Sequence, residues 1–177
     1  MKKALKQRLK NVKLLILDVD GVLTNGQIVL DPQGKEIKIF DVQDGFAIVF
    51  FHRMGYKTAV ISARTSAAVL ARARDLKIDK VYQDARPKIK AYRQLLAEMN
   101  LKDHEACFVG DDFPDVEILR KVGVAVAVAN AVKDVKSAAH YVTRRHGGQG
   151  AVREVIELIL KTQGRWDEVL KTFKIKP

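Results

Sequence analysis

Short apolar runs rich in valine and isoleucine alternate along the chain with longer segments of helical period. A strand buried on both faces reads as a continuous apolar run, and helices between such strands cover the faces of a parallel sheet. The pattern therefore predicts an α/β fold with a doubly wound, mostly parallel, Rossmann-like sheet. We expect core strands at residues 12–17, 58–61, 80–82, 106–109, 124–128 and 141–143.

Segments of helical period fill most of the intervals between these strands. The basic start of the chain predicts a first helix, and a last helical region from about 151 to 173 is expected to be interrupted at Gly164. Pro87 and Pro114 suit first-turn positions, while Gly55 and Gly123 suit helix ends. The other predicted helices span residues 46–54, 66–76, 87–99, 114–122 and 132–138.

One segment breaks the alternation of strands and helices soon after the first strand. Residues 27–30 and 35–40 are extended candidates joined by the turn sequence DPQG. Such a turn between two apolar runs is typical of a β-hairpin. We therefore expect a hairpin at about residues 26–40 that projects from the sheet.

The composition limits the size and the location of the protein. With 177 residues, 47% of them hydrophobic, we expect one domain over residues 1–177, including a C-terminal tail from about 144 to 177. No apolar stretch reaches the ~20 residues of a membrane-spanning helix, and the start lacks a small-residue cleavage site. The single cysteine, Cys107, excludes a disulfide framework. We expect a cytoplasmic protein without a membrane partner.

The net charge of +11 fits an anionic small substrate, a nucleic-acid partner, or lysines that only maintain solubility. The basic residues are spread along the chain, without the interleaved aromatic residues that stack on bases. We therefore do not expect nucleic acid as a partner.

Acidic residues follow two of the predicted buried strands. Asp18 and Asp20 lie in the run LLILDVDG, directly after the strand predicted at 12–17. Asp111, Asp112 and Asp115 lie in the run ACFVGDDFPD, after the strand predicted at 106–109. Either group alone could cap a turn or a helix, and Asp112 suits the cap of a helix at Pro114. Acids that converge from two strands at one sheet edge repel each other unless a cation is bound, and clustered carboxylates suit Mg²⁺.

Two further polar residues complete a possible phosphate site. Ser62 follows the strand at 58–61, where its hydroxyl and nearby N–H groups could bind phosphate oxygens. Lys88 opens the helix at 87–99, where its ammonium could neutralise a transferring phosphoryl group. Taken singly, Ser62 could equally be a helix cap instead of a phosphate ligand, and Lys88 could equally be a solvated surface lysine. Their order at successive strand ends favours the functional interpretation.

These residues, in this order, resemble the four motifs of the haloacid dehalogenase-like superfamily of aspartyl-phosphate phosphatases. The matching stretches are DVDGVLT at 18–24, Ser62, Lys88 and GDDFPD at 110–115. The resemblance implies that Asp18 is the nucleophile and Asp20 the general acid and base. It also implies that Ser62 and Lys88 hold the phosphoryl oxygens. Mg²⁺ would be bound by the carboxylates of Asp18 and Asp111 and the main-chain carbonyl of Asp20.

Members of this superfamily usually carry a cap domain between these motifs. Here the residues from 21 to 61 hold only the predicted hairpin and one helix, and those from 63 to 87 one helix and one strand. These segments are too short to contain a cap domain. We therefore expect neighbouring subunits of a homo-oligomer to cover the site.

The capless pattern, the segment DVQDG at 41–45 and the tail TRRHGGQGAVRE at 143–154 resemble the 3-deoxy-D-manno-octulosonate 8-phosphate phosphatase family. That family forms tetramers and serves lipopolysaccharide synthesis. The resemblance implies that the substrate is bound by Asp20, Asp41, Val42, Gln43, Asp44, Gly45, Arg64, Arg72 and Lys88. A solvated helix face remains the alternative for Arg72.

The chain departs from the family pattern at three positions. Ala47 and Ala63 replace glycines, and Val49 replaces an arginine that contributes to substrate binding in the family. The loss of this arginine leaves a phosphatase for a nonulosonate or other sugar phosphate open. The net charge leaves a nucleotide or polynucleotide-end phosphatase open, and the fold alone also allows a non-catalytic scaffold.

Overall fold

The computed structural model describes residues 3–175 of the chain. The ends of the predicted domain (1–177) and tail (144–177) extend over residues 1, 2, 176 and 177, which lie outside the described part.

A six-stranded sheet, parallel throughout, forms the centre of the structure and confirms the predicted α/β class. Its strand order is β5-β4-β1-β6-β7-β8, so β1 lies between β4 and β6. The central strands are completely buried, which explains their unbroken apolar sequences. The strands are β1 (Leu14–Leu17), β4 (Lys57–Ile61), β5 (Lys80–Tyr82), β6 (Ala106–Gly110), β7 (Val124–Ala127) and β8 (Tyr141–Val142).

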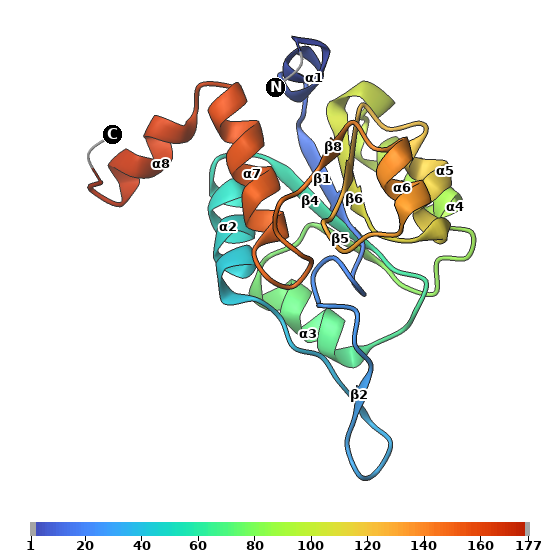
Figure 1. Cartoon of the computed structure of the whole chain (residues 1–177). Helices are drawn as coiled ribbons and strands as arrows, with labels where there is room; N and C mark the ends of the chain where they lie inside the picture. The colour runs from blue at the N-terminus through green and yellow to red at the C-terminus, as the bar shows by residue number, and fades with distance from the viewer. Residues whose placement is uncertain (1–2, 176–177) are drawn as a thin grey trace.

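Helices cover both faces of this sheet (Figure 1). One face carries α2 (Val42–Arg53) and α7 (Ala151–Thr162), which pack against each other, and α3 (Ala67–Asp75) lies below α2 in this view. The other face carries α4 (Lys88–Met99), α5 (Val116–Leu119) and α6 (Lys133–Ala138). The remaining helical segments are α1 (Lys3–Leu9), α8 (Trp166–Thr172) and the 3₁₀ turns η1 (Asp103–Glu105) and η2 (Phe113–Asp115).

Several predicted helix boundaries were wrong. Helix α2 begins at Val42 instead of 46, since the Asp41 carboxylate accepts a hydrogen bond from Asp44 N at 2.9 Å and caps the helix there. The segment predicted as one helix at 114–122 is divided into η2 and the shorter α5. Pro87 occupies the cap position before α4 rather than its first turn. The break at Gly164, which has φ +73°, is confirmed.

The predicted hairpin is present and projects from the edge of the sheet at which the strands end (Figure 1). Its strands are β2 (Val29–Leu30) and β3 (Glu36–Ile37), paired antiparallel. No helix among the described residues is both long enough and apolar enough to cross a membrane.

A carboxylate from α2 holds the start of α7. Asp44 is only 1% exposed, and its two oxygens accept hydrogen bonds from Arg153 N at 2.7 Å and from Gly150 N at 3.2 Å. These N–H groups belong to the first turn of α7, where a helix has no internal acceptor for them. Asp44 thereby fixes the glycine-rich loop 146–150 relative to α2.

Burial raises the pKa of Asp44 to about 6, although the N–H donors of Arg153 and Gly150 oppose the shift. The folded protein therefore holds this proton more tightly than the unfolded chain, so the contribution of Asp44 to stability falls as the pH rises from about 4 to about 6. We expect Asp44→Asn to lack this loss. Urea unfolding across that range measures it, with Asp167→Asn on exposed α8 as control; parallel stability profiles for Asp44→Asn and wild type would contradict it.

Candidate active site

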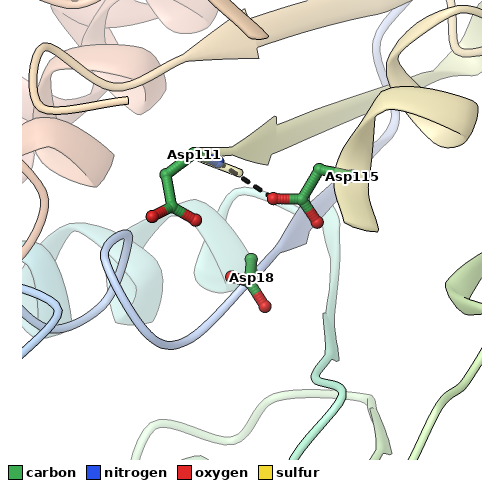
Figure 2. Close-up of side chains that lie close together, drawn as sticks. All are labelled: Asp18, Asp111 and Asp115. Atoms are coloured by element: carbon green, nitrogen blue, oxygen red, sulfur yellow. Dashed lines mark hydrogen bonds between the residues drawn. The ribbon is translucent and has the colours of Figure 1, made fainter. Parts of the chain in front are cut away.

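Three carboxylates meet where β1 and β6 end. Asp18 follows β1 and Asp111 follows β6, and these strands are neighbours in the sheet. Asp115 comes from η2, just beyond β6. One oxygen from each of the three carboxylates lies within 4.8 Å of the others (Figure 2). The predicted convergence of acids from two strands is therefore present in the structure.

The side chain of Lys88 joins two of these acids. It is the first residue of α4, and its side chain is 4% exposed. Its ammonium donates hydrogen bonds to Asp18 Oδ1 at 2.6 Å and to Asp115 Oδ1 at 2.7 Å. Burial lowers the pKa of Lys88, but the charges of Asp18 and Asp115 outweigh this effect, so the pKa is raised overall and the ammonium is charged.

Asp115 stabilises the turn after β6 by accepting hydrogen bonds from the main chain of that turn. Its Oδ2 accepts hydrogen bonds from the main-chain N–H groups of Asp111 at 2.9 Å and Asp112 at 3.3 Å. Asp112 caps η2 by accepting a hydrogen bond from Phe113 N at 2.8 Å, as the capping alternative predicted. A Cβ atom on Gly110 would lie 2.6 Å from Asp115 Oδ2, so only glycine fits at the end of β6. The role of Asp115 in holding this turn could not be read from the sequence.

The charges of the cluster fit a divalent cation. Three carboxylates and one ammonium give a formal charge of −2 (three negative, one positive). Burial, followed by the charge of Asp115, raises the pKa of Asp18 to about 6. Burial, followed by the charge of Asp18, raises the pKa of Asp111 to about 8. A hard cation such as Mg²⁺ would relieve this repulsion and prefers carboxylate oxygens.

The predicted phosphate-binding residues line the same cleft of about 320 Å³. Ser62 follows β4 and is 3% exposed, and its Oγ accepts a hydrogen bond from Arg64 N at 3.2 Å. The structure thus brings Ser62 and Lys88 together with the acids, as the motif order predicted. The predicted residues that line this cleft are Asp18, Asp20, Ser62, Arg64, Lys88 and Asp111, together with Ala63, Asp112 and Asp115.

A larger depression of about 920 Å³ lies at the opposite edge of the sheet, lined by residues such as Lys13, Tyr56 and Asp79. Three of its lysines are paired with acids: Lys13 with Glu105 at 2.6 Å, Lys57 with Asp79 at 3.1 Å and Lys80 with Glu98 at 2.6 Å. It holds no group of carboxylates that could bind a metal, among the residues described. We therefore assign the chemistry to the smaller cleft.

The hairpin reaches back to Asp20, which the sequence did not reveal. The buried ammonium of Lys38 forms an ion pair with the Asp20 carboxylate and another with Glu36 at 3.2 Å. Arg64 approaches Asp20 Oδ2 at 3.6 Å and donates a hydrogen bond to Glu36 at 2.7 Å. The only sequence signal was that Glu36 and Lys38 lie two residues apart, on one side of an extended segment.

The loop after Asp18 is fixed by residues that are distant in sequence. Asn130 donates a hydrogen bond to Gly21 O at 3.0 Å and accepts one from Gly147 N at 2.7 Å. Gly21 has φ +90°, and a Cβ there would lie 2.0 Å from Asp111 Oδ2. The glycine-rich tail therefore packs on the loop after Asp18 of its own chain. Asn130 was missed because nothing but its place after β7 marks it.

Other predicted substrate-binding residues lie outside the cleft of this chain. Asp41 caps α2, Asp44 is buried against α7, and the exposed Val42 and Gln43 line a separate depression with Arg145. Arg72 pairs with Asp75 at 2.6 Å and packs against Gly45. Their contact with substrate stays a prediction.

The three departures from the family pattern are accommodated locally. Ala47 is fully buried and Val49 packs against the core from α2. Ala63 lies in the cleft, where its carbonyl accepts a hydrogen bond from Arg86 Nε at 2.9 Å.

Removing the buried ammonium should leave two carboxylates facing each other. With the metal chelated, we expect Lys88→Met to lower the free energy of unfolding by about 3–5 kcal/mol, as for a broken buried ion pair. Mg²⁺ should restore part of the loss. Urea unfolding measures both effects, with exposed Lys90→Met of the same helix as control. A loss no larger than that of the control would show that the bridge does not stabilise the fold.

Comparison with known proteins agrees with this geometry. The model of a family described as haloacid dehalogenase-like hydrolase matches residues 77–156. The chain is 42% identical over 159 residues to 3-deoxy-D-manno-octulosonate 8-phosphate phosphatase of Yersinia pestis, covering 90% of this chain and 85% of that protein.

Solved structures are similar over nearly the whole chain. The enzyme of the same name from Moraxella catarrhalis, solved with a magnesium ion, phosphate and KDO, has a TM-score of 0.95 at 36% identity, covering 98% of this chain and 99% of that one. A YrbI-family phosphatase from Pseudomonas syringae also has a TM-score of 0.95, at 40% identity, covering 99% and 100% of the two chains. The chain therefore belongs to the 3-deoxy-D-manno-octulosonate 8-phosphate phosphatase family of haloacid dehalogenase-like hydrolases.

Proposed function

We propose that this protein hydrolyses 3-deoxy-D-manno-octulosonate 8-phosphate to the free sugar acid and phosphate, with Mg²⁺ as cofactor, in the cytoplasmic synthesis of lipopolysaccharide precursors. The observation that supports it most is the contact of Lys88 with Asp18 inside a cleft that also contains Ser62 and Asp111. The names of the related proteins supply the substrate. We further propose that residues 1–177 act as one catalytic domain.

In the proposed first step, a carboxylate oxygen of Asp18 attacks phosphorus. The new O–P bond forms as the bond between phosphorus and the ester oxygen breaks, and the ester oxygen takes a proton from Asp20. In the second step the Asp20 carboxylate accepts a proton from water, whose oxygen attacks phosphorus and releases phosphate and the free Asp18 carboxylate. Dividing the reaction through a covalent intermediate replaces one high barrier by two lower ones.

The other cleft residues would stabilise charge on the phosphoryl group. Lys88 holds one oxygen of Asp18 in place at 2.6 Å, so the nucleophile has a fixed orientation before the substrate arrives. The ammonium of Lys88 and the hydroxyl of Ser62, which line the same cleft, would contact phosphoryl oxygens. Asp18, Asp111 and the Asp20 carbonyl would hold Mg²⁺, which offsets the repulsion between carboxylates and polarises the phosphoryl group.

Phosphate release from 3-deoxy-D-manno-octulosonate 8-phosphate with and without Mg²⁺ tests the activity. We expect Mg²⁺-dependent turnover that Asp18→Asn abolishes while the fold is preserved, because the amide cannot act as the nucleophile. Exposed Asp134→Asn is the matched control. Unchanged activity of Asp18→Asn would refute the nucleophile.

The choice of substrate needs its own comparison. A panel containing a nonulosonate 9-phosphate, simple sugar phosphates and nucleotides covers the alternatives. If simple sugar phosphates are hydrolysed as fast as 3-deoxy-D-manno-octulosonate 8-phosphate, the octulosonate assignment is wrong. Absence of turnover on every member would favour the non-catalytic scaffold.

We also propose that the protein is a homo-oligomer, and specifically a tetramer as in its family. Neighbouring subunits would cover the cleft. The hairpin supports this proposal, since apolar side chains are exposed on both of its faces, at 47–66% of their full area: Ile28, Leu30, Ile37 and Ile39. A projecting two-stranded hairpin with such side chains is only marginally stable when it is left in water. A second copy of the chain would bury them.

Charges placed on the hairpin should break this assembly. We expect the double variant Leu30→Glu, Ile39→Glu to sediment as a smaller species than wild type and to lose activity, because the apolar contacts are replaced by like charges. Lys35→Glu, in the hairpin turn, is the control. A wild-type monomer that is fully active in sedimentation and activity measurements at the same concentration would contradict the proposal.

A further inference from the structure

The basic side chains around the cleft differ in how far their charge is already neutralised. Lys88 contacts two carboxylates, Asp18 and Asp115. Arg64 donates to Glu36 at 2.7 Å and lies 3.6 Å from Asp20. Lys38 is paired with the same two acids. These three cations therefore have carboxylate partners before any substrate binds.

Arg86 is the exception. It lies on the loop between β5 and α4, two residues before Lys88, and its side chain lines the same cleft. Within the described residues 3–175, no carboxylate forms an ion pair with Arg86. Its one side-chain hydrogen bond to a residue in this range runs from Nε to Ala63 O at 2.9 Å.

The contact with Ala63 places the guanidinium beside the loop that begins at Ser62. It uses only Nε, so both Nη nitrogens stay available as donors on the outer end of the guanidinium. Two parallel N–H donors match the two oxygens of a carboxylate, and such charge-assisted pairs are stronger than neutral hydrogen bonds. Arg86 is exposed and lines the cleft, so its outer end can reach the part of a substrate beyond its phosphate.

We propose that Arg86 is a specificity-determining residue that binds the carboxylate of a phosphorylated sugar acid. The inference rests on the proposed function and adds a residue that the motif pattern did not select. The phosphoryl group is served by Ser62, Lys88 and the metal site, which leaves Arg86 for a second anionic group of the substrate. It distinguishes sugar acid phosphates from neutral sugar phosphates.

Steady-state kinetics of Arg86→Gln on two substrates tests the assignment. One is 3-deoxy-D-manno-octulosonate 8-phosphate and the other is mannose 6-phosphate, which has no carboxylate. We expect kcat/KM for the sugar acid phosphate to fall roughly 10- to 100-fold, mainly through KM, as for the loss of a hydrogen bond to a charged group. The value for mannose 6-phosphate should change less than about threefold. Arg86→Lys, which keeps the charge but not the two parallel donors, should recover part of the activity.

Arg93→Gln is the matched control, since Arg93 is exposed on the following helix and lies away from the cleft. Equal losses on both substrates would mean that Arg86 serves the phosphoryl group or the fold, and would overturn the inference, as would unchanged kinetics on both. Wild-type protein without Mg²⁺-dependent turnover of the sugar acid phosphate would instead remove the proposed function, and this inference with it.

Discussion

The ammonium of Lys88 lies between the carboxylates of Asp18 and Asp115, and all three groups are buried. A buried carboxylate costs much free energy unless a cation or hydrogen bonds compensate it, and two that lie close together cost more. Lys88 supplies one positive charge, and the main-chain N–H groups of Asp111 and Asp112 stabilise the second oxygen of Asp115. The remaining excess of negative charge is what a divalent metal would neutralise.

The strand arrangement and the loop contacts hold these charged groups at one point. β1 and β6 are adjacent and parallel, so their carboxyl ends deliver Asp18 and Asp111 to the same edge. The loop beyond Asp18 is fixed by Asn130 and by the glycine-rich tail, which Asp44 anchors through α7. The side chains of the cluster therefore come from the ends of paired strands, from η2 and from the first residue of α4.

The sequence predicted the parts of this structure that depend on short-range patterns. Buried apolar runs located the strands. The motif order located Asp18, Ser62, Lys88 and the acids after β6, because these residues follow strand ends and the carboxyl ends of parallel strands all lie at one edge of the sheet. It failed where a single side-chain contact decides the result. The start of α2 depends on the cap at Asp41, and the ion pair that brings Lys38 to Asp20 depends on how the hairpin folds back. Neither leaves a periodic signal in the sequence.

The central claim is that the carboxylates at the ends of β1 and β6 form a metal site whose charge Lys88 only partly balances. Calorimetric titration of the metal-free protein with Mg²⁺ at neutral pH tests it most directly. We predict one Mg²⁺ bound per chain, with affinity reduced at least about tenfold in Asp111→Asn, because a charged ligand becomes a neutral amide. Binding of equal strength in the variant, or no binding to the wild-type chain, would contradict this account.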